Sequence, residues 1–144
     1  MRRALRLLLA SAALSSLAAC VGLPTYVPEP HEPLARVKLS PNIASGSLGM
    51  CTSKGQYRVP VKDGYVEVPA DQRVSLWHTY VASGYQVTYH CSPGMSFDAY
   101  ENVVYYADFE VRAEKCSLAI YREDKTSRAG LAFDATVAPL VCPR

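Results

Sequence analysis

The chain has 144 residues, of which 49% are hydrophobic and 19% charged; this is typical of a globular protein and too apolar for a disordered one. One compact domain takes about 100 to 150 residues, so the length excludes two full domains. The formal net charge is +2, but three of the 15 basic residues lie among the first six residues. The rest of the chain has 12 basic and 13 acidic residues, which excludes a basic nucleic-acid-binding protein.

Residues 1–19 have the pattern of a secretory signal peptide. Three arginines precede an apolar run over residues 7–14, and mainly small residues follow up to Cys20. The apolar run is too short to span a bilayer, which takes about 20 consecutive apolar residues. We therefore predict that this segment is cleaved and that it does not remain as a transmembrane helix.

The motif Leu17-Ala18-Ala19-Cys20 resembles the lipobox of bacterial lipoproteins. In that family the cysteine thiol is alkylated by a diacylglycerol, the peptide is cut just before it, and the new N-terminus is usually acylated. The resemblance implies lipidation of Cys20, with a plain signal peptide and an incidental cysteine as the alternative. Two or three acyl chains would anchor the protein stably, since each buried CH₂ contributes about 0.8 kcal/mol. The residue after the cysteine is Val21 rather than Asp, and in enteric lipoproteins this implies the outer membrane.

Residues 20–35 are predicted to form the lipidated cysteine and a Pro-rich tether. Four prolines lie within residues 21–35, and each fixes φ and lacks a backbone donor, which disfavours a helix or a central strand. A polyproline-II spacer of this length would hold the domain up to roughly 45 Å from the membrane. His31 is expected to be a solvated residue of this tether. The folded domain is accordingly expected to cover residues 36–144.

From Arg36 onward, apolar and polar residues alternate with the period of β-strands. The expected strands cover residues 36–39, 57–62, 65–68, 73–81, 85–91, 105–111 and 116–120, with the last strands within residues 131–142. The expected turns are Asp63-Gly64, Pro69-Ala70-Asp71, Ser83-Gly84 and Ser92-Pro93-Gly94. Seven or eight short strands with frequent turns predict an all-β fold. We favour an antiparallel β-sandwich, immunoglobulin-like or transthyretin-like, with a small barrel as the alternative.

Four cysteines remain once Cys20 is set aside as the lipidated residue. They are Cys51, Cys91, Cys116 and Cys142. An even number in an exported domain predicts two disulfides, and three pairings are open. We prefer Cys91–Cys116, which joins the end of one strand to the start of another, together with Cys51–Cys142, which ties the first part of the domain to the last. A zinc site is the alternative, but the sequence has neither a C-x-x-C motif nor clustered histidines.

The sequence provides no catalytic constellation. It has neither a G-x-S-x-G nor an S-x-x-K motif. His78 and His90 fall on strands of one expected hairpin but several residues out of register, so a shared site is not implied. The carboxylate pairs Asp108/Glu110 and Glu123-Asp124 lie on an expected exposed strand face and in a charged loop. We therefore predict that the protein is not an enzyme and has no catalytic residue, cofactor or metal.

The aromatic content is unusual for so short a chain, with ten tyrosines and one tryptophan. Many of them crowd residues 77–106. Tyr and Trp are enriched at protein interfaces, and they also pack well in a sandwich with their polar ends at its rim. Packing is the favoured interpretation, with a protein interface second and stacking on sugars third. The candidate interface residues are Trp77, Tyr80, Tyr85 and Tyr106.

Three stretches resemble small uncharacterised proteobacterial lipoproteins. They are residues 65–74 with the turn Pro69-Ala70-Asp71, the segment Cys91-Ser92-Pro93-Gly94-Met95-Ser96-Phe97, and Tyr105 with the later Cys116-Ser117-Leu118. The resemblance covers roughly half of the mature chain, and Asp71 stands where that group usually has Gly. It supports a β fold and the Cys91–Cys116 pairing, but the group has no activity to carry over.

Two functions of different classes are consistent with these patterns. The first is a non-catalytic, lipid-anchored envelope lipoprotein that binds or assembles with another envelope protein, with its domain in the periplasm. The second is an inhibitor of a lytic enzyme such as lysozyme, which predicts an exposed loop carrying a Ser and a Lys. The expected partners are thus the membrane, through the lipid anchor, and an envelope protein, with no nucleic acid.

Overall fold

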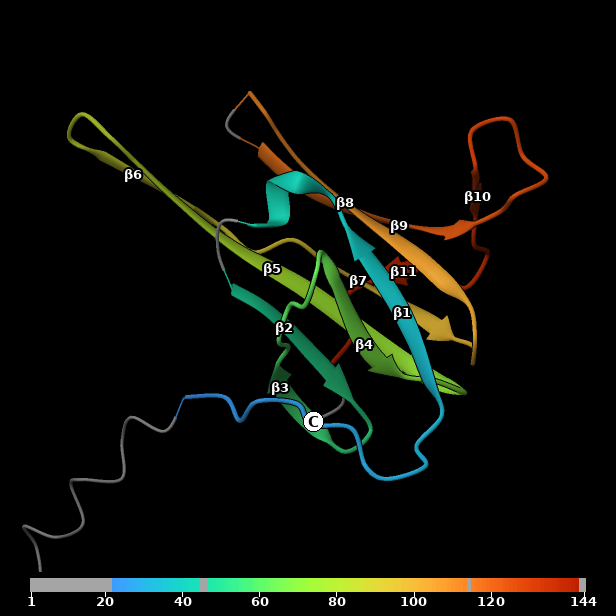
Figure 1. Ribbon diagram of the computed structural model, residues 1–144. Coiled ribbons are helices and arrows are strands. Elements are labelled where there is room, and N and C mark those ends of the chain that lie inside the picture. The colour runs from blue at the N-terminus through green and yellow to red at the C-terminus, as the bar shows by residue number, and fades with distance from the viewer. Residues whose placement is uncertain (1–21, 45–46, 114, 143–144) are drawn as a thin grey trace, which may run out of the picture.

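The computed structural model describes residues 22–44, 47–113 and 115–142 and has two packed β-sheets (Figure 1). The five-stranded sheet has the order β10-β9-β8-β1-β4. Its strands are β1 (Leu34–Leu39), β4 (Tyr65–Pro69), β8 (Val104–Arg112), β9 (Lys115–Glu123) and β10 (Leu131–Phe133). The predicted lipidation site, Cys20, and the predicted signal peptide, residues 1–19, lie outside the described residues.

The six-stranded sheet has the order β11-β7-β5-β2-β3, and β6 pairs with β5. Its strands are β2 (Ser47–Thr52), β3 (Gly55–Arg58), β5 (Gln72–Gly84), β6 (Val87–Cys91), β7 (Gly94–Ala99) and β11 (Ala138–Pro139). A short 3₁₀ helix, Pro41–Ala44, follows β1. The prediction of an all-β sandwich is confirmed, although the short edge strands raise the number of strands above seven or eight. Among the named strands, pairing is antiparallel except between β1 and β8, which are parallel.

The core forms where the alternating side chains of the two sheets meet. In β8, Tyr105, Ala107 and Phe109 are buried while their neighbours are not, as the period of two predicts. The Tyr105 hydroxyl donates a hydrogen bond to the Asp98 carbonyl oxygen of β7 at 3.1 Å, so a polar contact crosses between the sheets. Burial is the main cause of a raised pKa at Tyr105 and keeps this hydroxyl protonated as a donor.

Both predicted disulfides are present, and the pairing is the preferred one. Cys51–Cys142 ties β2 to the segment of residues 134–142, which we call the C-terminal strap. The strap crosses the outer face of the six-stranded sheet, where the carbonyl oxygens of Pro139 and Val141 accept hydrogen bonds from the buried hydroxyls of Ser96 and Ser75. The strap therefore provides hydrogen-bond acceptors for the two hydroxyls that it buries.

The folded part begins earlier than the expected boundary at residue 36. In the N-terminal segment, residues 22–33, Tyr26 is buried and belongs to the core. The Pro24 carbonyl oxygen accepts a hydrogen bond from the Arg58 N–H at 2.8 Å, and the Tyr26 N–H donates to the Arg58 carbonyl oxygen at 2.9 Å. The prediction of a free tether was thus wrong for residues 24–33, because a proline still offers its carbonyl to the edge of a strand.

Two of the expected turns are correct, one is displaced, and one is an interruption between two strands. Asp63-Gly64 and Pro69-Ala70-Asp71 turn the chain as predicted, with Asp63 and Gly64 both at positive φ. Ser83-Gly84 instead ends β5, and the turn lies at Tyr85-Gln86. Ser92-Pro93 is an interruption rather than a turn, because β6 and β7 on either side of it pair with the same strand β5.

Candidate functional site

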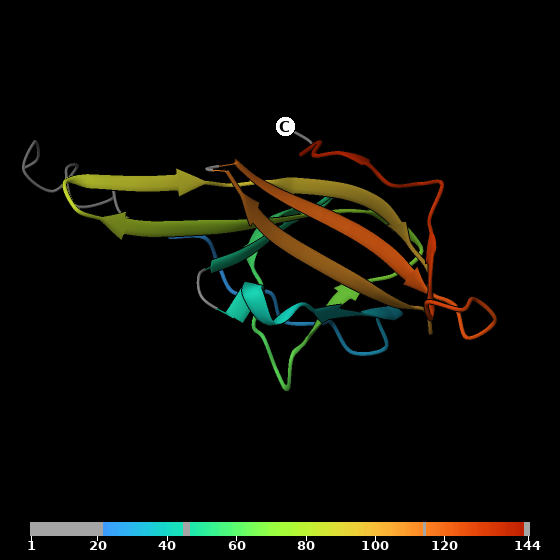
Figure 2. The same cartoon turned by 90° about the horizontal axis from the view of Figure 1, so that it is seen from above.

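Strand β5 runs past the end of the sandwich and forms a projecting hairpin with β6 (Figures 1 and 2). Its first part pairs with β2 and β7, whereas residues 80–84 pair with β6 alone among the described strands. The register places Tyr80 opposite Cys91 and Gly84 opposite Val87, which leaves Tyr85 at the tip. We call residues 80–91 the arm.

An open hollow of about 330 Å³ lies between the arm and the end of the β8–β9 hairpin. Its lining combines aromatic and aliphatic groups with a disulfide and one lysine: Tyr80, Ala82, Tyr89, His90, Cys91, Val111, Lys115 and Cys116. We call this hollow the arm cleft. The Tyr80 ring centroid lies 5.6 Å from that of the buried Phe109, so the inner end of the cleft is continuous with the core.

Apolar side chains are exposed along the arm and beside it. Tyr85 is 91% exposed, and Val81, Val87, Tyr89 and Val111 are each between 43% and 55% exposed. Large contiguous apolar patches are uncommon on soluble monomers and usually mark a binding surface. The arm and its cleft are therefore the candidate site.

The Cys91–Cys116 disulfide fixes the geometry of the cleft. It joins the base of the arm to the start of β9, with a Cα–Cα distance of 6.4 Å. The two walls of the cleft, one from each sheet, are thereby held together covalently. A site whose walls are already positioned loses less conformational entropy on binding.

The predicted interface residues do not form one surface. Tyr80 lines the arm cleft and Tyr85 occupies the tip, so these two lie on the candidate site. Trp77 lies on the outer face of the six-stranded sheet, and Tyr106 lies on the outer face of the five-stranded sheet, between the buried Tyr105 and Ala107. The sandwich thus separates residues that the sequence places in one cluster.

Several residues that line the site are not predicted from the sequence. Tyr89 is one of many aromatic residues, and Val111 and Lys115 belong to another hairpin, β8–β9. Pairing of Cys91 with Cys116 was the signal that could have located them, because it predicts that the residues beside both cysteines lie close together. The cleft follows from that pairing together with the length of the arm.

The histidines are separated, as their register predicts. His78 is fully buried with its ring edge against Phe109 at a centroid distance of 4.5 Å, whereas His90 lies on the arm opposite Val81. Within the described ranges, no group of three His, Cys, Asp or Glu side chains lies close enough to hold a metal ion. The arm cleft consequently offers apolar contact and one cation rather than paired acid and base groups.

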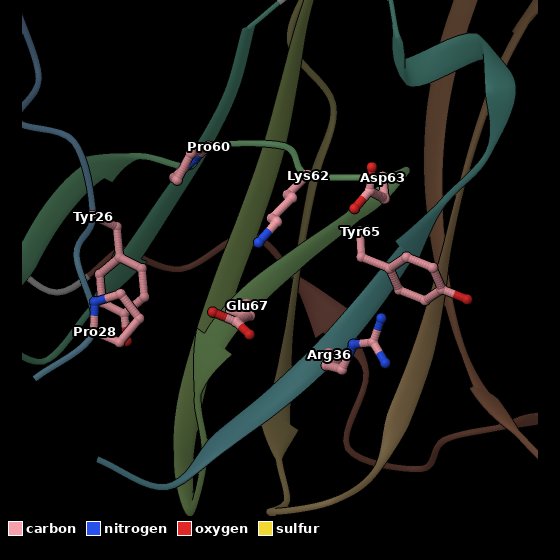
Figure 3. A pocket seen from close by; sticks show the side chains of 8 residues that line it. All are labelled: Tyr26, Pro28, Arg36, Pro60, Lys62, Asp63, Tyr65 and Glu67. Atoms are coloured by element: carbon pink, nitrogen blue, oxygen red, sulfur yellow. The ribbon is translucent and has the colours of Figure 1, made fainter. Parts of the chain in front are cut away.

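A second, larger hollow of about 510 Å³ lies over β1 and β4 (Figure 3). Its lining comes from the N-terminal segment, the loop before β4 and the two strands: Tyr26, Pro28, Arg36, Pro60, Lys62, Asp63, Tyr65 and Glu67. Figure 3 shows the guanidinium of Arg36 beside the ring of Tyr65, and the distance to the ring centroid is 4.2 Å.

The charges in the lining of this second hollow balance. The lining contains two cations, Arg36 and Lys62, and two carboxylates, Asp63 and Glu67. The Tyr26 hydroxyl donates to the Glu32 Oε2 at 2.9 Å, and burial, followed by that hydrogen bond, raises the pKa of Tyr26 above its usual range. The Tyr26 hydroxyl is thus engaged within the N-terminal segment, and the balanced charges of the lining select no single class of ligand.

Comparisons of the chain with protein-family models, with curated proteins and with solved structures find no match. The expected likeness to immunoglobulin or transthyretin topologies and the resemblance to small proteobacterial lipoproteins stay predictions. In the part of the chain that the structure describes, no helix is long and apolar enough to cross a membrane.

Proposed function

We propose that this chain is a lipoprotein, anchored in the outer membrane by acyl chains on Cys20, whose periplasmic domain binds another envelope protein without catalysing a reaction. The observation that carries the binding role is the exposed apolar arm with its disulfide-fixed cleft. The lipobox pattern and the two disulfides, which are typical of exported proteins, support the location.

A protein segment fits the arm better than a small polar ligand does. Tyrosines supply large contact areas at small entropic cost, and they are frequent among the residues that dominate binding energy. The cleft is open along one side and has a single cation, Lys115, at its edge. A partner with an apolar segment and a carboxylate nearby would match both features.

Photocrosslinking in intact cells tests this proposal. A photoreactive amino acid replaces Tyr85 at the tip of the arm, and Tyr100 serves as the matched control because it is an exposed tyrosine in the loop after β7, at the opposite end of β5 from the arm. We expect a discrete protein adduct from position 85 and none from position 100. Equal adducts from both positions, or none from position 85, would contradict the proposal.

A second variant shows whether the arm itself is recognised. Val87→Asp adds a charge to the cleft side of the arm at a half-exposed position, so the sandwich should fold with both disulfides intact. We expect the adduct from position 85 to be lost in this variant. An undiminished adduct would indicate capture by proximity rather than binding.

Inhibition of a lytic enzyme is the second candidate from the sequence. The loop of Ser53 and Lys54 between β2 and β3 carries the required residue types, but the Lys54 ammonium is paired with Glu29 Oε1 at 2.8 Å and with Glu32 Oε1 at 3.4 Å. That pairing favours a role of Lys54 in holding the N-terminal segment. A lysozyme assay with the purified protein tests the alternative directly.

A further inference from the structure

The N-terminal segment fixes the place at which the chain leaves the domain. Residues 24–26 run along the edge of β3 with two backbone hydrogen bonds to Arg58, and the Arg58 Nη2 donates to the Thr25 Oγ1 at 3.3 Å. Tyr26 is buried just beyond. The described chain before Pro24 therefore lies next to β3 and β2 and is not free to reach other faces of the sandwich.

Gly22 and Leu23 line a hollow of about 380 Å³ on the outer face of β2, β3 and β5, together with Ser47, Leu48, Gly49, Arg58 and Trp77. The indole of Trp77 lies against Gly49, where any Cβ would overlap the ring atoms Cε2 and Cζ2. Glycine at this position thus allows a large aromatic ring to lie against the strand. We call the surface of Leu23, Arg58 and Trp77 the Trp77 face.

The sequence limits how far Cys20 can lie from this face. Three residues lie between Cys20 and the docked Pro24, and an extended chain advances at most about 3.6 Å per residue, so their Cα atoms can be at most about 14 Å apart. A free tether of residues 20–35 would have allowed roughly three times that distance. If acyl chains on Cys20 enter a bilayer, the Trp77 face is the part of the domain nearest to the lipid.

We propose that the Trp77 face lies against the phospholipid surface, with Trp77 at the depth of the headgroups and Arg58 on their phosphates. The proposal rests on the lipidation of Cys20 proposed above. Trp is enriched at membrane–water interfaces because its ring is apolar and its N–H is polar. A guanidinium matches the geometry of phosphate oxygens, and exposed Leu23 adds an apolar contact.

The fluorescence of Trp77 tests this arrangement, because the chain contains one tryptophan. The full acylated protein is purified from membranes and reconstituted into phosphatidylethanolamine and phosphatidylglycerol vesicles. The vesicles carry a nitroxide quencher at either a shallow or a deep position of the acyl chain. We expect loss of Trp77 emission with the shallow quencher, a smaller loss with the deep one, and protection from a quencher dissolved in water.

A charge reversal at Arg58 and a matched reversal elsewhere sharpen the test. Arg58→Glu keeps the backbone hydrogen bonds to the N-terminal segment and should reduce quenching by the shallow nitroxide. Arg128→Glu makes the same change in charge in the exposed loop between β9 and β10 and should leave quenching unaltered. Equal changes in quenching in the two variants would show that Arg58 does not contact the phosphates.

Two further measurements distinguish a failure of this inference from a failure of the proposed function. Intact mass reports acylation of Cys20, and flotation with vesicles reports anchoring. A protein that is neither acylated nor floated contradicts the lipoprotein proposal itself. The protein could instead float with vesicles while its Trp77 emission is quenched by the aqueous quencher and by neither nitroxide. That result would contradict the contact of the Trp77 face with lipid, but it would not contradict the lipoprotein proposal.

Discussion

The two parts of strand β5 differ in what covers them. From Gln72 to Thr79 the strand has the core on one face, and the C-terminal strap and N-terminal segment cover parts of the other face. In the arm, residues 80–84 continue the same strand with β6 as the neighbour, and apolar side chains face solvent. Alternation of apolar residues therefore marks a strand, but it does not say whether both parts of that strand lie in the core.

Each part of β5 is secured by its own disulfide, and removing them separately should have the largest effects. Cys51, opposite Ser75, is bonded to Cys142 at a sequence separation of 91, whereas Cys91, opposite Tyr80, is bonded to Cys116 at a separation of 25. Chain entropy gives about 4 to 5 kcal/mol of stabilisation for the first and about 3 to 4 for the second.

The measurement is urea unfolding of the two double Cys→Ala variants. We expect the Cys51/Cys142 variant to be the less stable and to lose protection of the strap in hydrogen exchange. We expect the Cys91/Cys116 variant to lose protection mainly in the arm. A greater loss of stability in the Cys91/Cys116 variant would mean that the arm is a structural support rather than a free element.

Truncation of one side chain in each part makes a simpler test. Leu76 is fully buried, so Leu76→Ala should lower the free energy of unfolding by about 2 to 5 kcal/mol. Val81 is half-exposed in the arm, so Val81→Ala should change it by less than about 0.5 kcal/mol. Similar losses in the two variants would show that the arm is covered in solution, for example by a second copy of the chain.

The same distinction explains what could be predicted from the sequence. Alternation predicts that Val74, Leu76 and His78 share one face of β5, and in the structure all three are buried, because burial in a sheet has a period of two. It could not distinguish the buried Leu76 from the more exposed Tyr80, which has the same parity in the strand, because exposure depends on where the neighbouring strands end. The cysteine count limited the pairings to three, and both preferred bonds are present.

The two errors at the ends of elements also have physical causes. Ser83-Gly84 has the composition of a turn, but the strand continues to Gly84 and the turn uses Gln86 at positive φ. The prolines of the N-terminal segment exclude a helix, yet they do not exclude docking of the chain on the edge of β3. That docking depends on Tyr26 and Glu32, whose partners are distant in sequence or become close only after folding.

A smaller effect is expected from the hydroxyl that attaches the strap to β5. The Ser75 Oγ donates to the Val141 carbonyl oxygen at 2.8 Å, and Ser75→Ala should lower the free energy of unfolding by about 0.5 to 1.5 kcal/mol. Ser83→Ala in the exposed arm is the matched control and should be neutral within error. Thermal or urea unfolding of both variants measures the difference. Equal free energies of unfolding in the two variants would show that the Ser75 hydroxyl does not help to attach the strap.

The smallest effect should be a pH dependence of the N-terminal segment, which covers β3 beside the Trp77 face. Burial raises the pKa of Glu32, but hydrogen bonds from the Glu29 N–H, the Tyr26 hydroxyl and Lys54 outweigh it and lower the pKa overall. A lowered pKa in the folded state means that ionised Glu32 stabilises the docked segment above the unfolded pKa of about 4.3. That contribution is lost as the pH falls through the folded pKa.

We therefore expect the amide protons of Tyr26 and Arg58 to lose protection from hydrogen exchange as the pH is lowered through the folded pKa of Glu32. Protection should be corrected for the intrinsic pH dependence of exchange. Glu32→Gln still accepts a hydrogen bond from Tyr26 but cannot titrate, so its protection should be lower at neutral pH and nearly independent of pH. An unchanged pH profile in this variant would show that a group other than Glu32 titrates and controls the docking of the N-terminal segment.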